Sequence, residues 1–336
     1  MNNLSPHIIS EAVAPGATVA VIEPGYADYS LERECFEPLG VRLEILSAAD
    51  DPVMARRLAA VDPAVILLRD RQLSRDLMAA CPSLRGVVRY GVGVDNIDLA
   101  AARARNVIVA NVPNYGAEIE VSEHAVALYL AVQRRLLSRD AELRSGAWMV
   151  GQAAPIPSRE GAVLGLIGSG LIGRETARKF RALGFVRVLV HDPYLSDEII
   201  SEQGFERADL DSLCARANVI SLHAPSTAET RHMIDARRLG LMQRDAILIN
   251  VARGGLIDEV ALARALHEGQ IFGAGVDVFE TEPPAADNPL LGAPNIVLSD
   301  HNAWYSERSV RALQSRAAGY VVDILKGLEP DSRVNC

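Results

Sequence analysis

The stretch Val163–Leu183, VLGLIGSGLIGRETARKFRAL, joins an apolar run to a glycine-rich turn and then to an amphipathic segment. Gly168, Gly170 and Gly173 have the GxGxxG spacing, and the residues after them predict a helix that stops at Gly184. In such a unit the glycines permit a tight turn, a close approach of the backbone to a pyrophosphate, and close helix packing. The N-terminus of the helix stabilises the phosphate charge. The stretch therefore predicts a parallel α/β fold with a dinucleotide site.

Asp192 stands at the end of the next apolar run, VRVLV, about 20 residues beyond the glycines, where dinucleotide-binding folds place an acidic residue. A carboxylate there accepts hydrogen bonds from the adenine ribose, and its charge repels a ribose 2′-phosphate. The next residues, Pro193 and Tyr194, offer no guanidinium to bind such a phosphate. The sequence therefore favours NAD over NADP.

Short β-branched runs alternate with helical stretches on both sides of this unit. Before it the runs are TVAVI, RLEIL, AVILL, GVVRY and VIVAN, and from it onward VLGLI, VRVLV, NVISL, AILIN, GAGVDV and NIVLS. This alternation is typical of parallel sheets covered by helices. The apolar spacing over Glu118–Arg144 predicts one long helix between the two series, Gly151–Gly161 is expected to be a loop, and a last helix is expected over about Tyr305–Lys326.

Composition limits the class of protein. A chain of 336 residues exceeds one compact core, so we expect two domains, and 49% hydrophobic residues indicate a globular chain. The net charge of −9 gives no electrostatic reason to expect a nucleic-acid or membrane partner. No apolar run is long enough to span a bilayer, and the first residues lack the basic region of a signal peptide. We therefore expect a cytoplasmic protein.

The four cysteines are scattered along the chain without CxxC spacing or neighbouring histidines. They are Cys35, Cys81, Cys214 and Cys336. Such spacing predicts reduced structural thiols and no metal site.

Charged or titratable residues follow three other strands, namely Arg253, Glu282 and His301. In a doubly wound sheet, residues just beyond the carboxyl ends of the strands gather at one crevice. Each residue taken alone also fits an ordinary role, as a surface ion pair, a helix-starting acid and a loop histidine. From the residues alone, both interpretations remain open.

From about Gly86 to the last helix the chain resembles the D-isomer-specific 2-hydroxyacid dehydrogenases. The resemblance rests on the ordered motifs GVGVDNID, GLIGSGLIG, LHAPSTAETRHMI, INVARGGLIDEVAL, GAGVDVFETEPP and DHNAW. It implies two Rossmann-like domains: a flavodoxin-like substrate domain of residues 1–113 and 304–336, and an inserted NAD-binding domain of residues 114–303. It also implies an NAD-dependent enzyme that transfers a hydride between nicotinamide and a small 2-hydroxy or 2-oxo acid.

The resemblance makes Arg253, Glu282 and His301 a catalytic triad. The planar fork of Arg253 would hold the substrate carboxylate and polarise the adjacent carbonyl. His301 would exchange a proton with the substrate oxygen, and Glu282 would orient the imidazole and favour its charged form.

The resemblance further implies the binding residues. The backbone amides of Val92 and Gly93 would receive the substrate carboxylate, joined by Arg253, His301 and Trp304. The implied cofactor-binding residues are Gly168, Gly170, Leu171, Ile172, Gly173, Asp192, His223, Ala224, Pro225, Thr230, Val251, Ala252, Asp277, His301 and Ala303. Several of these, from His223 to Thr230 above all, also fit turns and caps. Family members are commonly dimers through the cofactor domain, so we expect a homodimer with the helix Glu118–Arg144 as its arm.

Two residues depart from the pattern or leave alternatives open. Asp300 stands where the family commonly has proline, and it either points to solvent or adds a second carboxylate beside His301. Trp304 either forms an apolar wall beside the substrate or anchors the final helix. No cluster of Lys or Arg is evident near the pocket motifs, so the wall would favour apolar substrates over phosphorylated ones.

A different class of function also fits the sequence. The segment HNAWYSE looks closest to the branch that contains the C-terminal binding protein corepressors. The alternative is therefore an NAD(H)-sensing dimeric binding protein with little turnover. All three triad residues and the full cofactor loop are present, which favours catalysis; the identity of the 2-hydroxy acid stays open.

Overall fold

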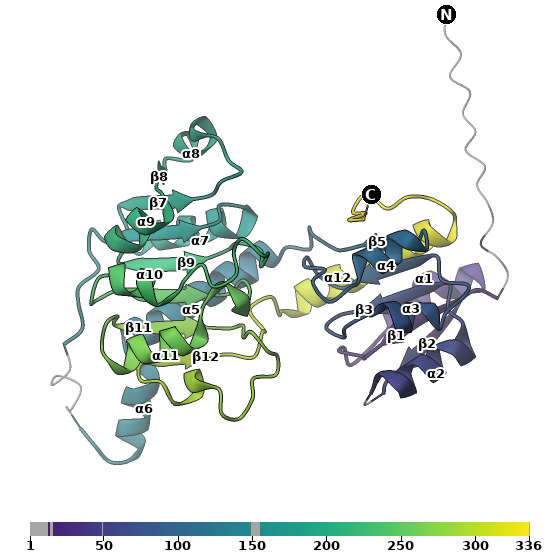
Figure 1. The fold of residues 1–336 in the computed structure, drawn as a ribbon, viewed down its shortest axis with the longest axis horizontal. Helices are drawn as coiled ribbons and strands as arrows, with labels where there is room; N and C mark the ends of the chain where they lie inside the picture. The colour runs from purple at the N-terminus through teal and green to yellow at the C-terminus, as the bar shows by residue number, and fades with distance from the viewer. Residues whose placement is uncertain (1–12, 14–15, 49, 149–154, 336) are drawn as a thin grey trace, which may run out of the picture. The chain divides into compact units, whose positions relative to one another are not determined.

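The computed structural model describes residues 13, 16–48, 50–148 and 155–335. The chain divides into two compact units, a first unit of residues 1–116 with 306–336 and a second unit of residues 117–305. Each unit is a parallel sheet covered by helices on both faces (Figure 1). This confirms the predicted α/β class with two Rossmann-like sheets.

The first unit contains five parallel strands in the order β2-β1-β3-β4-β5, the flavodoxin-like order. The strands are β1 (Thr18–Ile22), β2 (Arg42–Leu46), β3 (Val65–Leu68), β4 (Gly86–Arg89) and β5 (Ile108–Ala110). Every residue of β1 and β3 is buried, because helices cover both faces of the sheet. This burial explains why these strands are continuous apolar runs with no polar alternation.

One face of this sheet packs against α2 (Asp51–Val61), α3 (Arg75–Ala79) and α4 (Leu99–Ala104) through a continuous apolar core. The other elements of the unit are α1 (Ser30–Phe36), the short 3₁₀ turn η1 (Glu37–Leu39) and α12 (Glu307–Leu325). α12 packs on α1, β3 and β4. Residues from the two ends of the chain therefore build one domain.

The last described residues continue this unit along β5. Val334 N–H donates to the Val109 carbonyl at 2.8 Å, and the buried Asn335 side chain bonds to Val109 N at 2.9 Å and to the Val107 carbonyl at 2.8 Å. The tail thus satisfies backbone groups of an edge strand that would otherwise be available to other chains.

The second unit contains seven parallel strands in the order β12-β11-β10-β9-β6-β7-β8. They are β6 (Val163–Ile167), β7 (Arg187–His191), β8 (Glu206–Arg207), β9 (Val219–Leu222), β10 (Ile247–Asn250), β11 (Gly273–Val276) and β12 (Ile296–Leu298). The chain runs outward from β6 to β8 and then returns to β9 on the other side of β6. This reversal is the switch point at which ligands bind in open α/β sheets.

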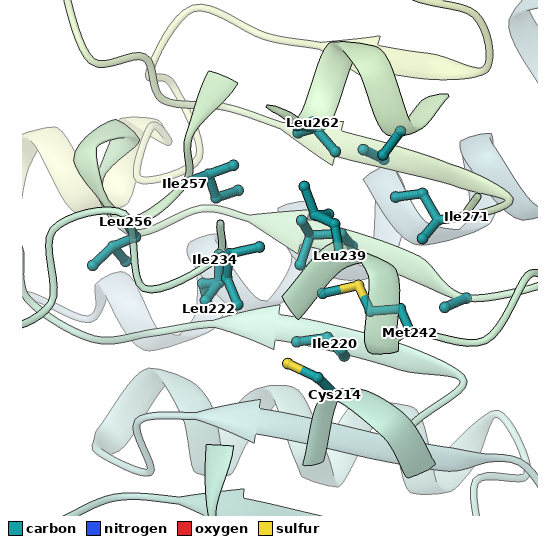
Figure 2. Packing of buried hydrophobic residues seen from close by; sticks show 14 of the residues in the cluster. Cys214, Ile220, Leu222, Ile234, Leu239, Met242, Leu256, Ile257, Leu262 and Ile271 are labelled. Atoms are coloured by element: carbon teal, nitrogen blue, oxygen red, sulfur yellow. The ribbon is translucent and has the colours of Figure 1, made fainter. Parts of the chain in front are cut away.

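Helices enclose the second sheet. α5 (Ala117–Gln133) contacts β10, β11, β12 and α7 (Leu171–Ala182). The remaining elements are α8 (Asp197–Glu202), α9 (Leu210–Arg216), α10 (Ala236–Leu241), α11 (Glu259–His267), and the 3₁₀ turns η3 (Gly254–Leu256) and η4 (Pro289–Gly292). Figure 2 shows the core in which Ile220 and Leu222 of β9 meet Leu239, Met242 and Leu262 from the α10–α11 side.

The expected single helix over Glu118–Arg144 is wrong. The structure has α5 followed by a separate helix, α6 (Leu136–Arg144), because Arg135 adopts a left-handed conformation with φ 52°. The Arg135 guanidinium stacks over the Phe272 ring at 5.1 Å. α5 buries its apolar residues on the sheet, whereas α6 buries none, so apolar spacing alone did not show where the helix ends.

Other expectations fall partly outside the described residues. Residues 151–154 of the expected loop lie outside them, and residues 155–161 contain neither helix nor strand. Cys81 and Cys214 are buried, and burial raises the pKa of each thiol to about 12. Cys35 is exposed, and Cys336 lies outside the described residues. Within the described part of the chain, no helix has the length and apolar character needed to cross a bilayer.

Candidate active site

Two of the three glycines at the turn between β6 and α7, Gly168 and Gly173, have no room for a side chain. Gly168 has φ +90°, and a Cβ on it would lie 2.6 Å from the His223 carbonyl oxygen. A Cβ on Gly173 would lie 2.5 Å from the Gly168 oxygen. Gly170 precedes the first residue of α7, where the space beside it is open and Leu171 and Ile172 start the helix. The helix N-terminus therefore faces an open position at the switch point.

Asp192 directly follows β7, and its carboxylate is hydrogen-bonded to the glycine turn. Its Oδ2 accepts a hydrogen bond from Ser169 N at 2.9 Å, and its Oδ1 accepts one from Tyr194 N at 3.0 Å. β8, which sequence analysis missed, places Arg207 beside the same loop. Arg207 Nη1 donates to the Asp192 carbonyl at 3.0 Å, and the guanidinium also contacts Asp197 and the Leu195 carbonyl. The loop after Asp192 thus has a guanidinium beside it, which Pro193 and Tyr194 do not supply, but that guanidinium is hydrogen-bonded to the loop itself.

His223 follows β9 and lies against the glycine turn. Its Nε2 is 2.9 Å from Ser221 Oγ, and its Nδ1 is shielded from solvent and has no hydrogen-bond partner in the protein. Burial lowers the pKa of His223 to about 3, so the ring is neutral at physiological pH. A buried ring nitrogen without a partner beside an open helix N-terminus fits a bound ligand that supplies the missing bond.

Ala224 and Pro225 follow His223, and Thr230 lies in the turn of residues 228–232 and bonds back to Pro225. The Thr230 hydroxyl donates to the Pro225 carbonyl at 2.7 Å and accepts from Thr227 N at 2.8 Å. These bonds match the turn role that the sequence left open for them. The structure thus shows a structural task for Thr230, and contact with a cofactor stays a prediction.

The loop after β10 carries Arg253. Asn250, at the end of β10, is buried; it accepts from Ala252 N at 3.1 Å and donates to the Arg253 carbonyl at 2.9 Å. Val251 is buried as well. A Cβ on Gly254 would lie 1.9 Å from the Phe279 carbonyl carbon, so this loop packs directly on the segment that leads to Glu282.

Glu282 and His301 form a close pair. His301 Nδ1 lies 2.6 Å from Glu282 Oε2, and Glu282 Oε1 accepts from Phe279 N at 2.9 Å. Burial alone raises the pKa of the Glu282 carboxyl, but the hydrogen bond and charge of His301, the Phe279 N–H and the Arg253 charge outweigh it and lower the pKa. The carboxylate is therefore ionised at neutral pH, and His301 Nε2 is the ring nitrogen left for proton exchange.

Asp277 holds the loop that carries His301. Its side chain is 1% exposed. Its oxygens accept from Ser299 Oγ at 2.6 Å, Asn302 N at 3.1 Å and Ala303 N at 3.1 Å, and its backbone carbonyl accepts from His301 N at 2.7 Å. His301 has φ 56°, so its backbone needs such support.

His124 of α5 belongs to the same network, and sequence analysis missed it. Its Nε2 lies 2.8 Å from Ser299 Oγ and 3.4 Å from Asp277 Oδ1. The earlier assignment of Asp277 and Ala303 to cofactor binding is not tested by these contacts. They show that both residues position the His301 loop. The sequence indicates a role for Asp277 only through its position directly after β11. It gives no sign that His124 contacts a loop about 175 residues away.

The structure shows hydrogen bonds for Asp300 and Trp304, the two residues of this loop for which the sequence left alternatives. Asp300 is exposed and accepts from the Asn302 side chain at 2.7 Å, which fits the solvent-facing alternative. Trp304 is half-buried and donates its Nε1–H to the His301 carbonyl at 3.0 Å. Trp304 therefore also supports the His301 backbone. Its role as an apolar wall stays a prediction.

Val92 and Gly93 lie in the first unit, in the loop after β4. The Asn111 side chain donates to the Val92 carbonyl at 2.6 Å. Gly91, which precedes them, has φ +132°. The backbone of this loop is thus held at the carboxyl edge of the first sheet, where Rossmann-like folds bind ligands.

The expectation that no Arg cluster lies near the pocket motifs is wrong. Arg69 after β3 and Arg89 at the end of β4 lie close together because β3 and β4 are neighbours in the sheet, and the Arg89 guanidinium lies against Gly91. Arg89 Nε donates to the Arg69 carbonyl at 3.1 Å, and both guanidinium groups lie near Asp70, at 2.6 Å from Arg69 and 3.7 Å from Arg89. The argument against phosphorylated substrates therefore loses its basis.

A family model for the NAD-binding domain of the D-isomer specific 2-hydroxyacid dehydrogenases matches residues 126–303. The chain is 38% identical to D-3-phosphoglycerate dehydrogenase of Methanocaldococcus jannaschii over 82% of this chain and 52% of that protein. It is 37% identical to glyoxylate reductase of Korarchaeum cryptofilum over 84% of this chain and 85% of that protein. It thus spans about half the length of its phosphoglycerate dehydrogenase relatives.

Solved structures agree with this similarity. The structure of D-lactate dehydrogenase from Aquifex aeolicus, complexed with NAD and lactic acid, superposes with a TM-score of 0.80 at 30% sequence identity. The match covers 92% of this chain and 96% of that one. Both units therefore have the fold of that protein.

Removing the charge of Asp277 will destabilise the His301 loop. An Asp277→Asn variant replaces one acceptor oxygen with an NH₂ group that faces N–H donors, so we expect a loss of about 3 kcal/mol of stability. Calorimetric melting and hydrogen exchange over residues 299–303 measure this loss. The control is Asp300→Asn, a neighbouring exposed aspartate, which should change stability by less than about 0.5 kcal/mol. Equal melting of the two variants would contradict the role given to Asp277.

Proposed function

This chain belongs to the D-isomer specific 2-hydroxyacid dehydrogenase family, and we propose that it is an NAD-dependent oxidoreductase interconverting a small 2-hydroxy acid and its 2-oxo acid. The observation that carries the proposal is the Glu282–His301 pair, at 2.6 Å, with the Arg253 charge acting on the same carboxylate. A histidine oriented by a carboxylate and placed near a guanidinium can exchange a proton with an oxygen whose carbonyl the guanidinium polarises.

Each residue of the site has one task in this proposal. Arg253 binds the substrate carboxylate and polarises the carbonyl group, and the amides of Val92 and Gly93 bind the carboxylate through the backbone. His301 delivers a proton from Nε2 to the substrate oxygen in reduction and removes it in oxidation. Glu282 holds the ring through Nδ1 and stabilises the positive charge that the ring carries before it gives up the proton.

The residues at the switch point fit a dinucleotide. The glycine turn and the α7 N-terminus would hold the pyrophosphate, Asp192 the adenine ribose, and His223 Nδ1 would gain the partner it lacks within the protein. When bound, the nicotinamide supplies or accepts the hydride. The family model describes residues 126–303 as an NAD-binding domain, which supports NAD as the cofactor.

A corepressor-like binding protein with little turnover is not favoured. The relatives described above carry the names of dehydrogenases and reductases, and the triad residues lie together in the second unit. The narrower likeness to the C-terminal binding protein branch stays a prediction. The substrate class also stays open, since the relatives' names cover phosphoglycerate, glyoxylate and lactate.

Replacing the proton donor will abolish turnover. The wild type should reduce at least one of glyoxylate, pyruvate, hydroxypyruvate, phosphohydroxypyruvate and phenylpyruvate with NADH. His301→Ala should lower kcat on that substrate by about 10²–10⁴-fold, because it removes general acid catalysis. Tryptophan-quenching titration should show that NADH still binds to the variant. His267→Ala, at the end of α11, is the control and should retain full activity. A fully active His301→Ala enzyme would exclude the assignment.

Removing the Glu282 charge will shift the pH profile. Glu282 has a lowered pKa, so it is charged throughout the neutral range, and Glu282→Gln removes a negative charge 2.6 Å from His301 Nδ1. In Glu282→Gln the pH at which reductive kcat/KM declines should therefore move down by about one unit or more. Profiles of kcat/KM between pH 5 and 9 measure the shift. An unchanged midpoint would show that the pair does not control the proton.

Asp192 should set the preference for NADH over NADPH. A carboxylate close to a 2′-phosphate costs enough free energy for a preference of about 100-fold or more. Asp192→Ser should reduce this ratio of kcat/KM values by at least about tenfold. Glu202→Gln, on α8, serves as the matched charge control. Comparable efficiency of the wild type with both cofactors would refute the role of Asp192.

We also propose that α6 mediates a homodimer. Leu136, Leu137 and Leu143 of α6 are 53%, 56% and 55% exposed, an apolar surface that a second copy can cover. Light scattering should give twice the 36.2 kDa mass of one chain. The double change Leu136→Glu with Leu137→Glu should yield a monomer, whereas Val260→Glu, at an equally exposed site on α11, should not. A monomeric wild type at micromolar concentrations would contradict the proposal.

A further inference from the structure

Three buried polar side chains lie behind the Gly91–Asp95 loop of the first unit. Tyr90, the residue before the loop, is 2% exposed, and its hydroxyl donates to Glu32 Oε1 at 2.7 Å. Gln314 of α12 donates its Nε2 to Glu32 Oε2 at 3.2 Å and to the Asp28 carbonyl at 2.7 Å. Residues from α1, the end of β4 and α12 therefore meet at one carboxyl group.

The Glu32 carboxyl group is fully buried and, among the residues that the structure describes, has no positively charged hydrogen-bond donor. Glu32 is 0% exposed, and both side chains that donate to it are neutral. Burial raises the pKa of Glu32, and it also raises that of Tyr90. Apolar groups of the same shape in place of all three side chains would be nearly neutral for stability, whereas loss of Glu32 alone would leave two buried donors without their acceptor. The arrangement therefore fixes the direction of the Tyr90 side chain.

The residues that follow Tyr90 are fixed from the other side. The Gly91 carbonyl accepts from Val112 N at 2.8 Å, and the Val92 carbonyl accepts from the Asn111 side chain at 2.6 Å. Tyr90 N donates to the Leu68 carbonyl at 2.8 Å. The Gly91 and Val92 carbonyl groups belong to the same peptide units as the Val92 and Gly93 N–H groups. Because these carbonyls and the Tyr90 side chain are all hydrogen-bonded, the orientation of the two N–H groups is fixed.

We propose that Tyr90, Glu32 and Gln314 are positioning residues for the substrate: they aim the amides of Val92 and Gly93 and so set the affinity for the substrate carboxylate. The proposal rests on the proposed function, which assigns the carboxylate to these amides. It extends that function to α12, because Gln314 contributes to substrate affinity without touching the substrate. Loss of the network should raise KM and leave NADH binding unchanged, since the cofactor residues lie in the second unit.

Tyr90→Phe removes one hydroxyl group and keeps the ring. Tyr29→Phe is the matched control, because Tyr29 is also buried, lies in the same cluster of rings, and uses its hydroxyl to accept from Gly25 N at 3.1 Å. In the full chain with NADH, Tyr90→Phe should raise KM for the best 2-oxo acid about tenfold, with kcat within about twofold. Tyr29→Phe should keep the wild-type KM, even where its melting temperature falls as much.

A second variant covers the case in which Tyr90→Phe does not fold. Gln314→Met keeps the Tyr90–Glu32 bond and removes the link to α12, so we expect a KM about threefold above that of the wild type. Oxamate, an unreactive 2-oxo acid analogue, gives a binding constant by calorimetry with NADH present and needs no turnover. Its affinity should fall in Tyr90→Phe and in Gln314→Met by the same factors as KM rises.

The outcomes separate the two proposals. Wild-type KM and oxamate affinity in the folded variants would overturn the positioning role and leave the proposed function intact. Equal losses in KM, kcat and NADH affinity would also overturn it, because they indicate a general structural defect. A wild type that reduces no 2-oxo acid would contradict the proposed function, whereas a selective loss of oxamate affinity in the variants would still support the positioning role.

Discussion

The candidate active site depends on one buried charge, the carboxylate of Asp277. Removing a carboxylate from water costs several kcal/mol, and here three hydrogen-bond donors from the loop after β12 offset that cost. The donors come from Ser299, Asn302 and Ala303, which flank His301, so the backbone of the histidine is fixed on both sides. The Glu282–His301 pair is consequently preorganised by the protein itself, which is the condition under which such groups are most effective.

The loop after β7, which carries Asp192, is also held by charged groups. The Arg207 guanidinium is bonded to the carbonyls of Asp192 and Leu195 and to the Asp197 carboxylate. Asp192 in turn accepts from the glycine turn through Ser169 N. Under the proposed function, the preference for NAD would follow from two features together, the Asp192 carboxylate and the engagement of the Arg207 guanidinium with the loop.

The sequence was sufficient for the fold class, the family and the described strands other than β8, because buried parallel strands and glycine turns leave strong local patterns. It failed where spatial neighbours are distant along the chain. Arg69 and Arg89 meet only because β3 and β4 pair, and Arg207 reaches its loop only through the two-residue strand β8. The break at Arg135 was missed because the apolar spacing continues into α6, although the leucines there are exposed. The amphipathic pattern shows which face is apolar and says nothing about what covers it.

The discontinuous first unit has a consequence for synthesis on the ribosome. Its five strands leave the exit tunnel early, but α12 and the tail that pairs with β5 are made only after all 189 residues of the second unit, Ala117–Tyr305. The second unit is continuous and can complete its core while translation proceeds, since domains generally fold as units. Until α12 and the tail are made, β3 and β4 lack the helix that packs on them, and the β5 edge is unpaired. Unpaired strand edges and exposed apolar surface favour association between chains, so this order of synthesis makes the first unit the more aggregation-prone part of the nascent chain.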